Sequence, residues 1–152
     1  MQKGFATLEI IFATLIIAIL VSTAIPNAVR IIDRVTLDYE TKRLYTDLRF
    51  LQSFDRMAYM ADSHFQTHYE ESAKLIIYPE RYVFVKNSNN KVYSEHYFLR
   101  GVTVDKIKTI RFDDMGKITP AASDTLTLSS RFGKPIYFKF DIVGRFRGSL
   151  TE

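Results

Sequence analysis

The sequence predicts an α+β protein in which one long N-terminal helix, transmembrane over its first half, packs on an antiparallel β-sheet head. Three observations predict this fold. Residues 5–25 form an apolar run, no glycine occurs between residues 5 and 64, and β-rich runs separated by turn residues follow from residue 73. The predicted units are a leader at 1–4, a transmembrane helix at 5–26, and an amphipathic helix plus β-sheet head at 27–152.

Composition sets the outer limits of the interpretation. The chain has 152 residues, 47% of them apolar and 25% charged, which is ordinary for one globular domain and excludes wholesale disorder. It has no cysteine, which excludes a disulfide framework and a thiolate zinc site. The net charge of +4 permits an acidic partner without requiring one.

The apolar run from Phe5 to Ile25 carries a single charge, Glu9. As a helix it is roughly 30 Å long, the thickness of a bilayer core. A cleaved signal peptide and a simple signal anchor are the plainer alternatives. The first is disfavoured because the run ends without a clear small-x-small cleavage site and is followed closely by Pro26.

An acidic residue inside lipid is costly, so Glu9 is expected to have a partner. Cleavage between Gly4 and Phe5 creates an α-amine on Phe5, about one helical turn from Glu9. On a neighbouring copy this ammonium group can neutralise the Glu9 carboxylate, because opposite charges attract strongly at low dielectric. Such a pair recruits one membrane helix to another in staggered register.

These residues resemble the type IV pilin and pseudopilin superfamily: Gly4, then Phe5, then Glu9 four residues on, then an apolar helix. The resemblance implies that a prepilin peptidase cuts after Gly4 and methylates the amine of Phe5, and that Glu9 serves assembly. Pro26 stands where many pilins carry a helix-kinking proline. Ala6 departs from the pattern, since threonine is commoner after the phenylalanine.

The helix is expected to continue to about Tyr59, with an apolar stripe formed by Leu44, Leu48, Leu51 and Ala58. Pro26 is expected to kink it. Strands are predicted at residues 73–78, 81–86, 91–99, 107–112, 125–129 and 136–142, with turns at 79–80, 87–90 and 113–116. The strand pattern toward the C-terminus resembles the GspH/FimT branch of the pseudopilins. The likeness lies in Ile110–Phe112 before a glycine-containing turn, in Thr125–Leu128, and in Ile136–Ile142 leading into Gly144 and Arg145.

The last 22 residues hold five basic side chains against two acidic ones, so they carry +3 of the net charge. Arg145 and Arg147 follow Gly144, and paired guanidinium groups match successive phosphates. In the FimT branch such a Gly-Arg-x-Arg element is associated with DNA capture. The DNA-contact hypothesis therefore names Gly144, Arg145 and Arg147, helped by Arg131, Lys134 and Lys139. The alternative is a turn before a last strand whose arginines are merely solvated.

Other patterns are less informative. His64 and His68 lie one helical turn apart, but no third ligand is fixed by spacing, so no metal and no cofactor are predicted. Asp113 and Asp114 are most simply turn residues. No catalytic motif occurs, so no enzymatic activity is predicted.

The function predicted from the sequence is that of a minor pilin or pseudopilin. It would be cleaved by prepilin peptidase and assembled into, or prime, a type IV pilus, a type II secretion pseudopilus or a DNA-uptake pseudopilus. The expected partners are prepilin peptidase, other pilins, the inner membrane and, for the DNA hypothesis, double-stranded DNA. The resemblance places the head outside the cytoplasm. A DNA-receptor module for natural transformation and a plain membrane-anchored domain are the alternatives.

Overall fold

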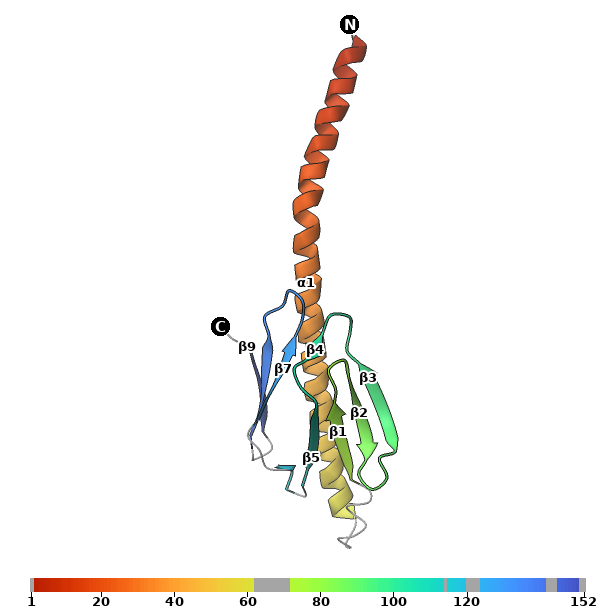
Figure 1. Ribbon diagram of the computed structural model, residues 1–152, viewed down its shortest axis with the longest axis vertical. Helices are drawn as coiled ribbons and strands as arrows, with labels where there is room; N and C mark the ends of the chain where they lie inside the picture. The colour runs from red at the N-terminus through yellow and green to blue at the C-terminus, as the bar shows by residue number, and fades with distance from the viewer. Residues whose placement is uncertain (1, 62–71, 114, 120–123, 142–144, 151–152) are drawn as a thin grey trace.

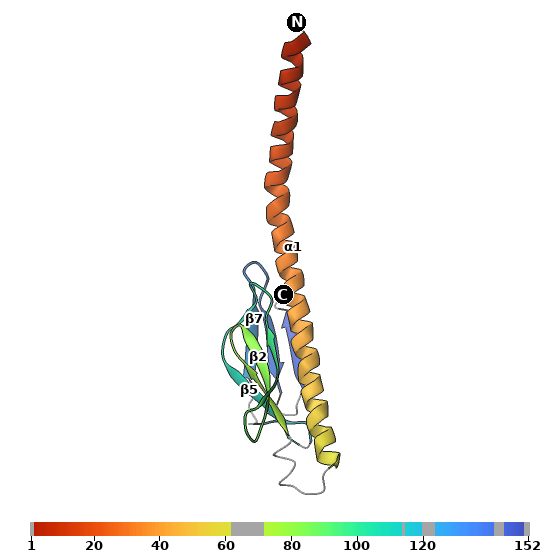
Figure 2. The ribbon, with the colours of Figure 1, turned by 90° about the vertical axis from the view of Figure 1, so that its right-hand side faces the viewer.

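The structure is a computed structural model that describes residues 2–61, 72–113, 115–119, 124–141 and 145–150, with side chains for 8–57, 72–113, 115–119, 124–141 and 145. It consists of one helix and nine strands in those residues. Helix α1 (Gln2–Ala61) is 60 residues long and runs without interruption through Pro26. Its first half projects alone, and its second half lies along the β-rich head (Figures 1 and 2).

The strands form two antiparallel sheets. The first sheet has the order β3-β2-β1-β5-β6 and the second has the order β4-β7-β8-β9. The first comprises β1 (Ala73–Ile77), β2 (Arg81–Lys86), β3 (Val92–Tyr97), β5 (Lys108–Phe112) and β6 (Ile118–Thr119). The second comprises β4 (Thr103–Val104), β7 (Asp124–Ser129), β8 (Ile136–Phe140) and β9 (Phe146–Leu150).

The hydrophobic core lies between the second half of α1 and both sheets. The helix touches β1, β5 and β7. Alternate residues of these strands are buried, as expected for strands with one face on a helix. The largest fully buried side chains are Leu37, Leu44, Leu48, Leu51, Leu75, Ile77, Tyr82, Ile110, Leu126, Leu128, Phe138 and Phe140.

The first half of α1 contributes nothing to this core. Every described side chain from residue 8 to residue 32 is exposed, and Leu37 is the first buried one among the described side chains of the helix. By length and composition α1 is long and apolar enough to cross a membrane. An exposed stretch of this hydropathy needs an apolar environment that the rest of the described chain does not provide.

The α+β fold predicted from the sequence is confirmed, with a long N-terminal helix packed on antiparallel β-structure. The helix ends at Ala61, two residues beyond the predicted end. The stripe residues Leu44, Leu48 and Leu51 are buried as expected. The side chain of Ala58 lies outside the described residues.

Two features of the head differ from the expectation. The strands form two sheets instead of one, and three strands lie outside the six predicted ranges: β4, β6 and β9. β4 and β6 are only two residues long, too short to show an alternating pattern. β9 was expected only in the alternative that places a last strand after the Gly144 turn. The six predicted strands are present, and the second, at Arg81–Lys86, has the predicted bounds.

Candidate functional site

The predicted processing and assembly residues lie at the free end of α1. Gly4 and Phe5 are in its first turns, where only the backbone is described. Glu9 is exposed, and its neighbours Leu8, Ile10 and Ile11 are exposed as well. No described side chain forms an ion pair or hydrogen bond with Glu9, so a partner for its carboxylate has to come from outside these residues.

The second half of α1 carries a row of carboxylates that the sequence analysis did not single out. Asp33, Glu40, Asp47 and Asp55 are spaced seven, seven and eight residues apart, which places them close to one face of the helix. Each accepts a hydrogen bond from the head. Glu40 and Asp55 are fully buried.

Asp33 bonds the β7–β8 loop to the helix, and Glu40 bonds β3 and the segment that follows it. Oδ2 of Asp33 accepts hydrogen bonds from Ser130 Oγ at 2.7 Å and from the Phe132 backbone N–H at 2.8 Å. Oε1 of Glu40 accepts from the Leu99 N–H at 3.1 Å, and its Oε2 lies 2.8 Å from His96 Nε2. The hydrogen bond from Ser130 lowers the pKa of Asp33, because it favours the charged carboxylate.

Asp47 and Asp55 fasten the first sheet. The Tyr82 hydroxyl donates to Asp47 Oδ2, and the Ala73 N–H donates to Asp55 Oδ1 at 3.1 Å. Burial and the Asp47 carboxylate both raise the pKa of Tyr82, because both disfavour the phenolate. The four carboxylates therefore fix the position of the head along α1. Their spacing of seven or eight residues can be read from the sequence, although the predicted stripe considered only apolar positions.

A groove of about 420 Å³ lies where α1 meets β2 and β3. Its walls are mostly apolar and aromatic, and the side chains of Phe50 and Tyr93 are more than half exposed. The lining residues are Arg43, Asp47, Phe50, Leu51, Phe54, Ala73, Tyr82, Phe84, Tyr93, Ser94 and His96. An apolar recess of this kind suits a hydrophobic side chain of a partner.

The predicted DNA-contact residues fall into two groups at opposite ends of β8. Lys139 is exposed and stands opposite Arg147 in the register of β8 and β9. Arg145 is exposed, and its carbonyl accepts a hydrogen bond from the Asp141 N–H at 2.8 Å, which closes the β8–β9 connection. Gly144 lies outside the described residues.

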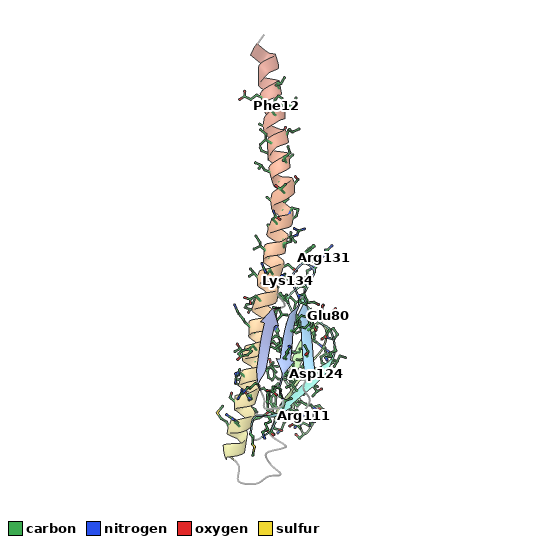
Figure 3. All side chains as sticks on the ribbon, turned by 90° about the vertical axis from the view of Figure 1, so that its left-hand side faces the viewer. Phe12, Glu80, Arg111, Asp124, Arg131 and Lys134 are labelled. Carbon is green, nitrogen blue, oxygen red and sulfur yellow. The ribbon has the colours of Figure 1, made fainter. Side chains whose placement is uncertain are left out.

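Arg131 and Lys134 form the other group, in the β7–β8 loop. Figure 3 shows them at the end of the head nearest the projecting half of α1, whereas Asp124 lies toward the opposite end. Asp124 pairs in register with Phe140, at the far end of β8. A single patch of all six residues is therefore not formed by the described part of the chain.

The remaining histidine and aspartate pairs of the sequence contribute to no functional site among the described residues. His64 and His68 fall outside the described residues, and the described ones contain no group of three or more histidine, aspartate or glutamate side chains placed to hold a metal ion. Asp113 acts in a turn, where its Oδ1 accepts from the Lys117 N–H at 2.6 Å. Asp114 is not among the described residues.

Comparison of the chain with models of known protein families, with curated proteins and with solved structures found no match.

Proposed function

We propose that the protein is a minor pilin or pseudopilin whose N-terminal helix is anchored in the inner membrane and then inserted into a filament. Prepilin peptidase cleaves after Gly4 and methylates Phe5, and the head lies outside the cytoplasm. The filament is a type IV pilus, a type II secretion pseudopilus or a DNA-uptake pseudopilus. Assembly is the activity, and no catalytic step is assigned to the chain.

One observation carries this proposal: Glu9 is the single charge of the apolar run from Phe5 to Ile25, and every described side chain of that run is exposed. Lipid can cover the apolar side chains, but it leaves the carboxylate without a counter-charge. A filament of packed helices covers both, because a neighbour supplies apolar surface and a terminal ammonium group. The aromatic groove beside β3 offers neighbouring subunits a second apolar contact surface.

The test is the substitution Glu9→Leu in cells that carry the assembly machine. We expect this variant to be inserted and processed normally but to be absent from sheared filaments. Thr14→Leu is the matched control, since it also removes a polar side chain of the same helix, one that bonds only the Ile11 carbonyl of its own turn at 2.9 Å. Normal incorporation of Glu9→Leu contradicts the proposed charge pair.

Processing is tested separately by mass spectrometry of the mature chain. A mature polypeptide that begins at a methylated Phe5 supports the proposal. Substitution of Gly4 by valine should block cleavage, because the added side chain lies beside the scissile bond. Identical mobility of the wild-type chain with and without the peptidase contradicts processing.

A second candidate function is DNA binding by the β8–β9 hairpin, supported by the register that sets Arg147 opposite the exposed Lys139. Three cations close to one hairpin can follow the phosphates of a duplex. The test is a salt titration of full-length protein in neutral detergent with duplex DNA. Removing Arg145 and Arg147 should weaken binding and lower the salt slope by about 2.

The opposite end of β8 supplies the control for this experiment. Arg131→Ala with Lys134→Ala removes the same charge from the β7–β8 loop. If this pair lowers the slope as much as the hairpin pair does, DNA contact reflects net charge and the hairpin hypothesis fails.

A further inference from the structure

The end of the head nearest the projecting half of α1 is basic and partly apolar. Four exposed cations gather there: Arg30 and Arg34 on the helix, and Arg131 and Lys134 on the β7–β8 loop. A hollow of about 270 Å³ separates helix and loop, lined by Arg30, Ile31, Arg34, Phe132, Gly133 and Lys134. Figures 1 and 3 show this loop beside α1 at the point where the helix leaves the head.

The acidic groups near this basic end are already engaged. Oδ2 of Asp33 accepts hydrogen bonds from the loop, and Asp38 is paired with Lys42 at 2.6 Å. None of the four cations forms an ion pair with a described residue. The Asp33 carboxylate attracts Arg131 electrostatically, but four cations outnumber it, so the basic end keeps a net positive charge that is complementary to an anionic surface.

The loop also presents an aromatic ring. Phe132 is 49% exposed, and the Arg131 guanidinium lies 5.1 Å from the centre of its ring. Asp33 holds the backbone of Phe132, so the ring is presented by a fixed loop. Ile31 and Ile32 on the adjacent helix turn are also exposed. Aromatic, aliphatic and basic side chains at one level are typical of the membrane–water interface.

The helix sets the depth of this surface relative to a membrane. Arg30 and Arg34 follow the last residue of the apolar run, Ile25, by five and nine residues, or about 8 and 14 Å along the axis. The headgroup layer of one leaflet is about 5–7 Å thick. Because helical side chains lean toward the N-terminus, long arginine side chains at these positions can reach back to lipid phosphates.

We propose that this basic end, formed by Arg30, Arg34, Arg131, Lys134 and Phe132, binds anionic phospholipid headgroups and seats the head on the membrane before assembly. The proposal rests on the proposed membrane anchoring of α1. The cations contact lipid phosphates, and Phe132 enters the interface between headgroups and acyl chains. Leaving the membrane for a filament then requires these contacts to be released.

The chain has no tryptophan, so Phe132→Trp introduces a unique fluorescent probe at the loop. Full-length protein is reconstituted in vesicles of phosphatidylcholine with or without phosphatidylglycerol, and quenching by brominated lipid reports the depth of the indole. We expect strong quenching in the anionic vesicles and weak quenching in the neutral ones. Added salt should reduce it, because headgroup attraction is screened.

Substitutions that remove basic side chains decide whether the loop binds anionic headgroups. Each basic residue near an anionic surface strengthens binding about fivefold, so Arg131→Gln with Lys134→Gln in the F132W background should weaken docking by about 25-fold. Lys139→Gln with Arg145→Gln removes equal charge from the other end of β8 and should leave quenching unchanged. Phe50→Trp, 20 residues beyond Arg30 on the same helix, should stay unquenched in every vesicle.

The outcomes separate the two proposals. If the protein fails to remain in the vesicles after alkaline washing, α1 does not anchor it and both proposals fall. If it remains inserted but the loop probe is unquenched, or is quenched equally in neutral and anionic vesicles, headgroup binding is wrong while the filament proposal stands. Equal loss of quenching in both charge-removal pairs also overturns headgroup binding at this loop.

Discussion

At the scale of single residues, Gly133 shows how tightly the β7–β8 loop is fitted to the helix. A Cβ atom at this position would lie 2.4 Å from Ser130 Oγ and 3.0 Å from Leu37 Cδ2. Ser130 cannot give way freely, because its hydroxyl donates to Asp33 and accepts from the Gly133 N–H. The loop therefore requires glycine for space rather than for turn geometry.

We expect Gly133→Ala to lower the free energy of unfolding by about 1–3 kcal/mol, the usual range for overpacking. Denaturant unfolding of the full chain in neutral detergent measures the change. Lys134→Ala, at the next and exposed position, is the control and should change stability by less than about 0.5 kcal/mol. Equal effects of the two substitutions would mean that the loop is not packed against Leu37.

The ionisation of Asp124 makes the stability of the fold depend on pH in the acidic range. Its carboxylate accepts hydrogen bonds from Lys106 Nζ at 2.6 Å and Lys108 Nζ at 3.1 Å, and the Lys106 bond is the main reason that the pKa of Asp124 falls to about 2. A folded-state pKa below the unfolded value stabilises the fold above the unfolded pKa. This contribution is lost as the pH falls through the folded pKa.

Asp124→Asn should therefore destabilise the protein at neutral pH, and the difference from wild type should vanish as the pH drops from about 4 to about 2. The side chain is 36% exposed, so solvent screening limits the difference to about 1 kcal/mol at most. Unfolding midpoints measured across this pH range test the prediction. A difference that persists at pH 2 would exclude carboxylate ionisation as its source.

At the scale of elements, the second half of α1 combines an apolar stripe with a row of carboxylates. The stripe was predictable, because Leu44, Leu48 and Leu51 follow helical spacing. The roles of Asp33 and Glu40 were not, because their partners in the head come from loops about 60 to 100 residues later in the chain. Sequence spacing can reveal a row of acids, but it does not reveal which backbone amides face it.

The arrangement of the strands into sheets was likewise not predictable from local sequence patterns. Alternating runs such as Ile136–Phe140 predict strands well, whereas Ile118–Thr119 is too short to carry a period. The division into two sheets depends on which strands pair. Pairing is settled by long-range packing and loop closure, which a local pattern does not record.

Glu40 is the member of the row whose loss should matter most. Glu40 is fully buried and is hydrogen-bonded to His96 and to the Leu99 N–H, so Glu40→Ala leaves two partly buried polar groups without this partner. We expect a loss of about 3 kcal/mol, measured by denaturant unfolding in detergent. Glu40→Gln retains an acceptor and should lose less.

The matched control lies two residues away on the same helix. Asp38 pairs with Lys42 in solvent, and both side chains are more than half exposed. Asp38→Ala should cost less than about 0.5 kcal/mol. If Glu40→Ala and Asp38→Ala are equally mild, the carboxylate row does not hold the head on α1.

At the scale of the whole molecule, the two halves of α1 have separate roles. Among the described side chains, Leu37 is the first along the helix that is buried, and the head core is completed by residues that follow it in sequence. The basic end and the exposed Ile31 and Ile32 mark the transition between the halves. Under the proposed function, this architecture would let a subunit move between membrane and filament while its head keeps one structure.

This division predicts that a chain starting at Ala28 folds without its apolar half. Its free energy of unfolding should lie within about 0.5 kcal/mol of the full chain in the same detergent, because the deleted residues that the structure describes bury nothing in the head. Far-ultraviolet circular dichroism should show less helix and unchanged β-structure. Leu44→Ala in the shortened chain is the reference for true loss of core packing, at about 2–5 kcal/mol. A shortened chain that is unfolded, or as unstable as this variant, would show that the projecting half supports the head.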